Sequence, residues 1–166
     1  MSQHYLNSSF REKLIEHLIV GELLKESWMK DNCSLEISKP EVDNSGYDII
    51  AEANGTVRHV QLKASFKGAT TARQKVHVDL AQKPSGCVLW VYFDKESLDL
   101  GPFLLFANPP GEPLPNIENF RVAKHTRANA NGEKAERPAI RVVTKGAFDH
   151  IGSIKELYDA LFAYRS

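Results

Sequence analysis

The sequence predicts an α/β protein built around one main mixed sheet. Three observations indicate this fold class: apolar residues at helical spacing near the start, an Asn54-Gly55 hairpin signal, and a continuous apolar run over 87–93. The chain has 166 residues, enough to bury one substantial core. We therefore expect a single domain over 1–166.

The first helix is expected over residues 8–30, because Ser9 and Glu12 have the spacing of a capping box and helical periodicity follows. A short strand over 35–38 precedes the hairpin. Beyond the hairpin we expect a loop over 65–71 and a helix over 74–83, a segment whose alternation of Val76 and Val78 also fits a strand.

The second half of the chain predicts further strands and one more helix. A continuous apolar run is typical of a buried central strand, and a Ser-x-x-Glu pattern before an apolar stretch is typical of a helix start. On these grounds we expect strands over 87–93, 103–107 and 140–144, a polar segment over 121–138, and a last helix that Ser153 opens and that ends near Phe162.

The Asn54-Gly55 turn fixes which residues face each other across the hairpin. A two-residue loop pairs Ala53 with Thr56, and counting outward places Asp48 opposite Gln61. Because side chains alternate along a strand, Lys63 shares the face of Gln61. The register gathers an acid, an amide and an amine on one face, a pattern that favours a metal-dependent active site.

A carboxylate on the first helix is expected to join them. On a helical wheel Glu22 falls inside the apolar arc, whereas Glu16 falls beyond it. A carboxylate on a buried face needs a partner or a metal, so Glu22 is expected to approach Asp48. An ion pair of Glu22 with Arg11 or Lys25 remains the alternative.

These residues resemble the motif of the PD-(D/E)XK nuclease superfamily, which includes restriction endonucleases and Holliday-junction resolvases. The matching features are the helical Glu22, Asp48 after Gly46-Tyr47, and Gln61-Leu62-Lys63. The resemblance implies a restriction-endonuclease-like αβββαβ core, here over about 8–95, with residues 96–166 extending the sheet and adding the final helix. It also implies Mg²⁺- or Mn²⁺-dependent hydrolysis of phosphodiester bonds in DNA.

The resemblance assigns a role to each residue. Asp48 would bind the metal, Glu22 would add a direct or water-mediated contact, and Lys63 would orient water or stabilise charge on the phosphate. The backbone carbonyl of Leu62 is a further candidate ligand. Gln61 stands where the superfamily usually has an acid and is a weaker ligand for a hard cation.

Four further residues are candidates for nucleic-acid contact: His59, Ser65, Lys67 and Arg127. His59 would face the site, where a structural hydrogen bond is the alternative. Ser65 and Lys67 are expected on a loop after the motif. Arg127 belongs to a basic cluster over 121–137, which Glu133 and Glu136 dilute, so a solvated loop is the alternative.

Composition limits the protein class. Equal numbers of basic and acidic residues, 21 each, give no overall attraction to nucleic acid or membrane, and no apolar run reaches the length of a membrane span. Two cysteines make no disulfide framework, so we expect a cytoplasmic protein.

The expected function is a metal-dependent endonuclease with DNA as its partner, and a homodimer is left open. Two alternatives stand beside it. One is a non-catalytic member of the same fold that binds nucleic acid or protein. The other is a small interaction protein, such as an antitoxin or immunity protein.

Overall fold

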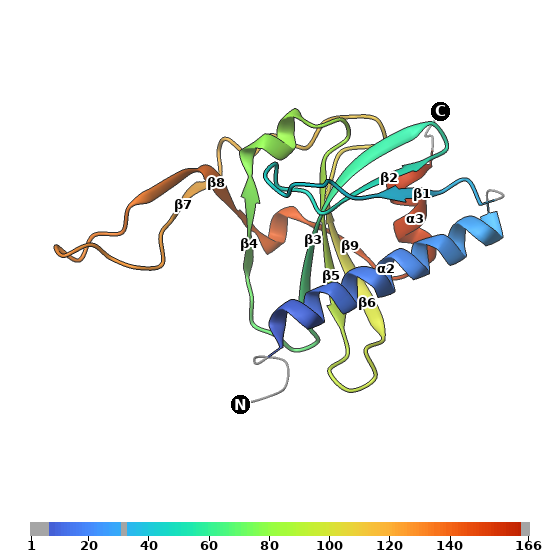
Figure 1. Cartoon of the computed structure of the whole chain (residues 1–166), viewed down its shortest axis with the longest axis horizontal. Coiled ribbons are helices and arrows are strands. Elements are labelled where there is room, and N and C mark those ends of the chain that lie inside the picture. The colour runs from blue at the N-terminus through green and yellow to red at the C-terminus, as the bar shows by residue number, and fades with distance from the viewer. Residues whose placement is uncertain (1–6, 31–32, 164–166) are drawn as a thin grey trace.

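The structure is a computed structural model that describes residues 7–30 and 33–163. Its main sheet has six strands in the order β1-β2-β3-β5-β6-β9, and only the β3–β5 pair is parallel (Figure 1). These strands are β1 (Glu36–Ser38), β2 (Ile49–Ala53), β3 (Thr56–Phe66), β5 (Cys87–Phe93), β6 (Leu100–Phe106) and β9 (Asp149–Ile151).

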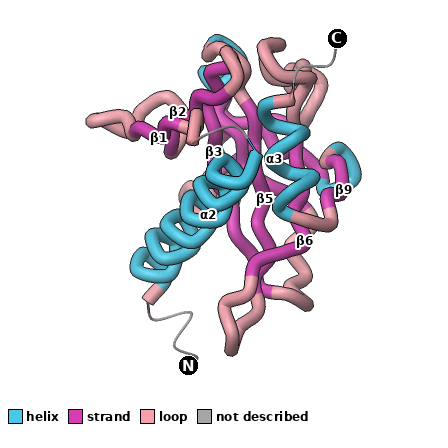
Figure 2. The backbone as a smooth tube through the Cα atoms, turned by 90° about the vertical axis from the view of Figure 1, so that its right-hand side faces the viewer, coloured by secondary structure: helices cyan, strands magenta, loops and turns pink. Residues whose placement is uncertain are grey.

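Both long helices cover the same face of this sheet (Figure 2). They are α2 (Ser8–Lys30) and α3 (Ile154–Phe162). Ile19 of α2 and Phe162 of α3 are fully buried against sheet side chains such as Leu89. In the described part of the chain, no helix is long and apolar enough to cross a membrane.

The opposite face of the main sheet is covered by a second sheet of three antiparallel strands in the order β4-β8-β7. The strands are β4 (Arg73–His77), β8 (Glu136–Thr144) and β7 (Arg121–Lys124), with short 3₁₀ turns at Val78–Gln82 and Lys145–Ala147. Val76 and Val143 are fully buried and pack in one cluster with Trp90 of β5. Beyond this contact, β7 and β8 extend away from the body as an arm (Figure 1), here called the β7–β8 arm, residues 121–141.

Several sequence predictions are confirmed. The fold is α/β with a central mixed sheet, α2 occupies the expected residues, and the hairpin pairs Ala53 with Thr56 and Ile49 with Val60. The last helix begins as expected, because the Ser153 side chain accepts the Glu156 N–H at 3.2 Å.

The helix expected over 74–83 is wrong. Residues 73–77 form β4, because Val76 enters the core while its neighbours pair with β8, and a 3₁₀ turn follows. The second helix of the αβββαβ order is therefore replaced by a strand and a turn. The loop expected from residue 65 begins later, since β3 continues to Phe66, and β7 and β9 were not predicted.

Arg58 ties β3 to the end of α3. The side chain is completely buried, and its Nε donates to the Leu161 carbonyl at 2.7 Å, while Nη2 donates to the carbonyls of Asn108 and Ala160 at 2.9 and 3.4 Å. Carbonyls in the last turn of a helix have no partner within the helix and carry partial negative charge. The guanidinium supplies the donors that these carbonyls lack.

We expect Arg58→Met to lower the free energy of unfolding by about 2–4 kcal/mol, because one buried and two partly buried carbonyls lose their donor at once. Urea unfolding measures the change. Arg73→Met removes an exposed arginine of the same size and should cost no more than about 0.5 kcal/mol. Equal losses in the two variants would contradict the role assigned to Arg58.

Candidate functional site

The candidate site lies where β2 stops and β3 continues. The pairing of β2 with β3 ends at Ile49 and Val60, so residues 61–66 of β3 have no β2 partner. A cavity of about 580 Å³ opens beside this edge, against the first half of α2. Its polar lining includes Glu12, Glu16, Asp43, Asp48, Gln61 and Lys63.

Asp48 is held at this point by two hydrogen bonds. Its own N–H donates to the Val60 carbonyl at 2.8 Å, and the Leu62 N–H donates to its carboxylate Oδ2 at 2.6 Å. The two partners lie on either side of Gln61 in β3, and both Asp48 and Gln61 line the cavity. Lys63 lines the same cavity, as expected.

Burial pushes both Asp48 and Lys63 toward their neutral forms. The pKa of Asp48 is raised, first by desolvation and then by Asp43 and Glu16, against the Leu62 hydrogen bond and the charge of Lys63. The pKa of Lys63 is lowered, first by desolvation and then by Lys75, although Asp48 and Glu12 oppose this. A half-buried acid and a half-buried amine with shifted pKa values in one cavity are typical of functional sites.

Gln61 contributes an unpaired oxygen. Its side-chain Oε1 is buried and has no hydrogen-bond partner among the described residues. A buried acceptor without a partner costs about 1–3 kcal/mol, so native structures rarely keep one without a ligand or water to satisfy it. Gln61 also lines a smaller adjoining cavity of about 250 Å³ together with Lys63, Lys75 and His77.

The helical acid at the site is Glu16, and the prediction of Glu22 is wrong. Glu16 lines the cavity of Asp48 and contributes to the raised pKa of that residue. Glu22 lines a separate cavity with Leu98 and Ser153. Its side chain is 39% exposed and forms an ion pair with Lys25 at 3.3 Å, which is the alternative that the sequence left open.

The error came from the phase of the helix. The buried stripe of α2 consists of Ile15, Glu16, Ile19, Leu23 and Ser27. With Leu14 at zero, Leu23 and Ser27 fall at about 180° and 220°, so the stripe includes Glu16 at about 200°. Apolar residues on the other side are exposed: Phe10 and Trp28 by 74% and Met29 by 79%.

Glu16 is almost fully buried, with 7% exposure, and is compensated by two lysines. It forms an ion pair with Lys13 at 3.3 Å and a second one with Lys39. Burial alone would raise the pKa of Glu16, but the hydrogen bonds and charges of Lys39 and Lys13 outweigh burial, and the pKa is lowered. Glu16 is thus held in its charged form.

The remaining candidates are placed as follows. His59 Nδ1 lies 2.8 Å from the Pro84 carbonyl, which matches the structural alternative. The expected loop position of Ser65 is wrong, because it is buried in β3 and accepts the Trp90 Nε1–H at 3.0 Å. Lys67 and Arg127 are exposed and do not line this cavity.

Sequence reasoning missed Lys75, which acts electrostatically on Lys63 and lines the adjoining cavity. Lys75 was missed because a helix, and not a strand, was expected over 74–83. The alternation Lys75-Val76-His77 was the signal that could have placed it on a strand beside the site.

Among the described residues, no three His, Cys, Asp or Glu side chains are arranged to hold a metal ion together. A cation at this site would therefore be held by two carboxylates, those of Asp48 and Glu16, with the amide oxygen of Gln61. The Leu62 carbonyl stays a candidate ligand, because the hydrogen bond of Leu62 to Asp48 uses its N–H.

Comparisons with models of protein families and with the sequences of characterised proteins gave no match. Among solved structures, the fold is similar to that of a bacterial homing endonuclease, I-Ssp6803I, with 20% identity and a TM-score of 0.35. The similarity covers 57% of this chain and 61% of that one, less than two thirds of its length. A similarity at this level carries no argument, so the function has to rest on the site itself.

The raised pKa of Asp48 has a consequence for stability. A carboxyl whose pKa is higher in the folded than in the unfolded state stabilises the fold below its unfolded pKa, and this contribution is lost as the pH rises through the folded value. We therefore expect Asp48→Asn, which can still accept the Leu62 N–H, to melt at a higher temperature than the wild type at pH 7.

The gain in melting temperature should shrink as the pH falls toward 3, because the wild-type carboxyl then becomes neutral as well. Calorimetry in the presence of EDTA measures both proteins across this range. Asp149→Asn, which removes an exposed carboxylate on β9, is the matched control. An Asp48→Asn protein that is less stable than wild type at pH 7 would contradict the assignment.

Proposed function

We propose that this chain is a metal-dependent endonuclease that hydrolyses phosphodiester bonds in DNA, with Asp48, Glu16, Gln61 and Lys63 forming its active site. The observation that carries the proposal is the buried, unpartnered Oε1 of Gln61 in a cavity shared with Asp48 and Lys63. An acceptor left without a partner beside a carboxylate suits a cation, and a lysine beside both suits an anionic substrate.

The donor set fits Mg²⁺ or Mn²⁺. Mg²⁺ prefers oxygen ligands and is usually held by one or two carboxylates, with water and substrate phosphate completing its shell. The Leu62 N–H bonds to Oδ2 of Asp48, which leaves Oδ1 for the ion, and Gln61 Oε1 is available in the same cavity. Glu16 would provide the second carboxylate by exchanging its lysine partners for the ion. Once bound, the ion would polarise the phosphoryl group and lower the pKa of a water ligand.

The other groups of the site would orient the metal ligand Asp48 and stabilise negative charge on the substrate. The Leu62 N–H fixes the rotamer of Asp48, so the free oxygen points in one direction. Lys63 is carried on the same strand two residues from Gln61 and is half-buried, where its charge acts more strongly on a phosphate than it would in solution. It would stabilise negative charge that develops on the phosphoryl oxygens or orient the attacking water.

The direct test is a cleavage assay on linear, circular, branched and single-stranded DNA, with RNA of matched sequence as a further substrate. We expect cleavage of at least one DNA substrate with Mg²⁺ or Mn²⁺ and none with EDTA. Absence of cleavage of every substrate with both ions would overturn the proposal.

A variant series tests the residues of the site. We expect Lys63→Ala and Glu16→Gln to lower the cleavage rate by about 10²-fold or more, because a preorganised charge at a reacting centre contributes about 3–4 kcal/mol to the barrier. Glu22→Gln is the matched control on the same helix and should cleave at the wild-type rate. Loss of activity in Glu22→Gln with a normal rate in Glu16→Gln would refute the site as drawn here.

A second function has its own support. Glu16 is already neutralised by Lys13 and Lys39, and Gln61 carries no charge. Both features suit a non-catalytic module of the same architecture that binds nucleic acid without cutting it. Titration calorimetry with Mn²⁺ separates the two: metal binding that Asp48→Ala abolishes supports the nuclease, and absence of any binding supports the module.

A further inference from the structure

A second groove adjoins the candidate site and differs from it in charge. It has a volume of about 530 Å³ and lies along the second sheet and the base of the β7–β8 arm. Six of its lining residues are cationic: Lys63, Arg73, Lys75, Arg121, Lys124 and Lys134. Among the described residues, no Asp or Glu lines it.

The register of the second sheet explains why these cations share one face. Lys75 of β4 and Arg121 of β7 both pair with Val142 of β8, so the two side chains project on the same side of the sheet about 10 Å apart. Arg73 lies two residues before Lys75 and shares that face. The opposite face carries Val76 and Val143 into the core, which leaves the charged face open.

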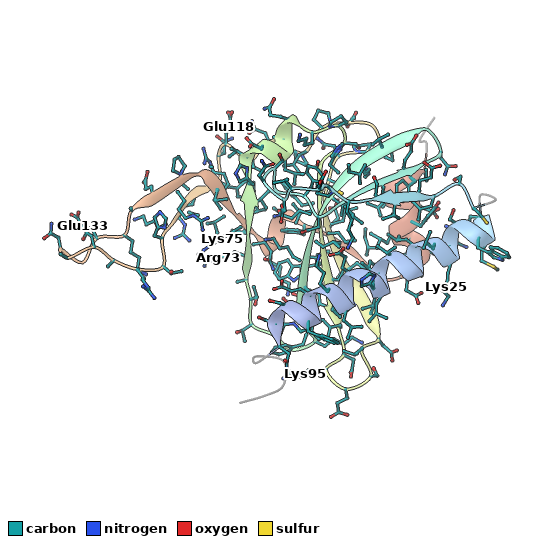
Figure 3. The ribbon with its side chains drawn as sticks, in the orientation of Figure 1. Lys25, Arg73, Lys75, Lys95, Glu118 and Glu133 are labelled. Atoms are coloured by element: carbon teal, nitrogen blue, oxygen red, sulfur yellow. The ribbon has the colours of Figure 1, made fainter. Side chains whose placement is uncertain are left out.

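In the described part of the chain, none of the six groove cations forms an ion pair with a carboxylate. Arg73, Lys75, Arg121, Lys124 and Lys134 are all exposed. Figure 3 shows Arg73 and Lys75 projecting from β4 on the side of the arm, and Glu133 at its far tip. The chain as a whole is neutral, so this gathering of charge is local.

The groove is continuous with the candidate site through Lys63 and Gln74, which line both. Val142 and Ala123 are its apolar lining residues, and neither is bulky. A polyanion lying in the groove would therefore reach the cavity of Asp48 and Gln61 at Lys63, with its negative charge matched along the way.

We propose that this cationic groove binds the phosphate backbone of a nucleic acid and leads it to Lys63, so that the arm provides binding without reading sequence. This inference rests on the proposed function in one respect: the groove is taken to lead a nucleic-acid strand to the proposed active site. Contacts to phosphates position a nucleic acid and carry no direct sequence information. They also make affinity strongly dependent on salt, since each neutralised phosphate releases counterions.

The test is fluorescence anisotropy with labelled 30-base-pair DNA, single-stranded DNA of the same sequence, and duplex RNA, in EDTA and over a range of salt concentrations. Two groove variants are compared with the wild type: Arg121→Ala with Lys124→Ala, and Arg73→Ala with Lys75→Ala. The control is Lys25→Ala with Lys155→Ala, which removes the same charge from exposed positions on the helices.

For duplex DNA we expect each groove variant to weaken binding about tenfold or more at low salt and to flatten the slope of log K against log salt by about 1.8, because two phosphate contacts are lost. The control should stay within about twofold of wild type. The inference is overturned if the control loses as much as the groove variants, if the groove variants bind as the wild type does, or if no nucleic acid binds.

Two further outcomes keep this inference separate from the proposed function. A wild type that binds through the groove but cleaves nothing supports the inference and refutes the nuclease. If the wild type cleaves DNA but the groove variants bind normally, the nuclease proposal is supported and the groove inference is refuted. Poly-glutamate is the competitor for an acidic protein partner: if the groove variants lose only poly-glutamate binding, the groove serves a protein and the inference fails.

Discussion

The hydrogen bond from the Leu62 N–H to the Asp48 carboxylate is the contact on which the site depends. In a hairpin that continued, a carbonyl of β2 would take this N–H. Here the side chain of Asp48 takes it, so β2 can leave β3 without stranding a buried donor. The edge of β3 beyond Val60 is thereby opened, and the cavity forms there. The Asp48 carboxylate thus ends the β2–β3 hydrogen bonding and also belongs to the candidate site.

The two faces of the main sheet make separate contributions to this opening. The helical face supplies the acids of α2, among which Glu16 is compensated by lysines. The other face supplies the cations of the second sheet and the arm. Lys63 lies where the two meet. A net charge of zero, read from composition, says nothing of this separation, because it is a sum over surfaces of opposite charge.

The features predicted from the sequence are those fixed by neighbouring residues. Asn54 and Gly55 both have positive φ, 52° and 77°, as the two-residue turn requires, and the turn sets the register as far as Ile49 and Val60, the neighbours of Asp48 and Gln61 in the chain. The phase of α2 was missed because the helical wheel counted Met29, which is exposed, as part of the buried apolar arc beside Glu22. The second sheet was missed because it pairs Arg73 with Thr144, and no local pattern reports a partner so far along the chain.

Arg58 also bears on how the chain is synthesised. The arginine is made early, and its principal acceptor at Leu161 follows 103 positions later. A nascent chain still lacking α3 has nothing to receive the guanidinium and no cover for the half of the sheet on which that helix packs. All residues of the candidate site, from Glu16 to Lys63, therefore leave the ribosome well before α3 can pack on the main sheet. A fragment that ends after β5 would contain every residue of the candidate site but would lack α3, the helix against which Arg58 is buried.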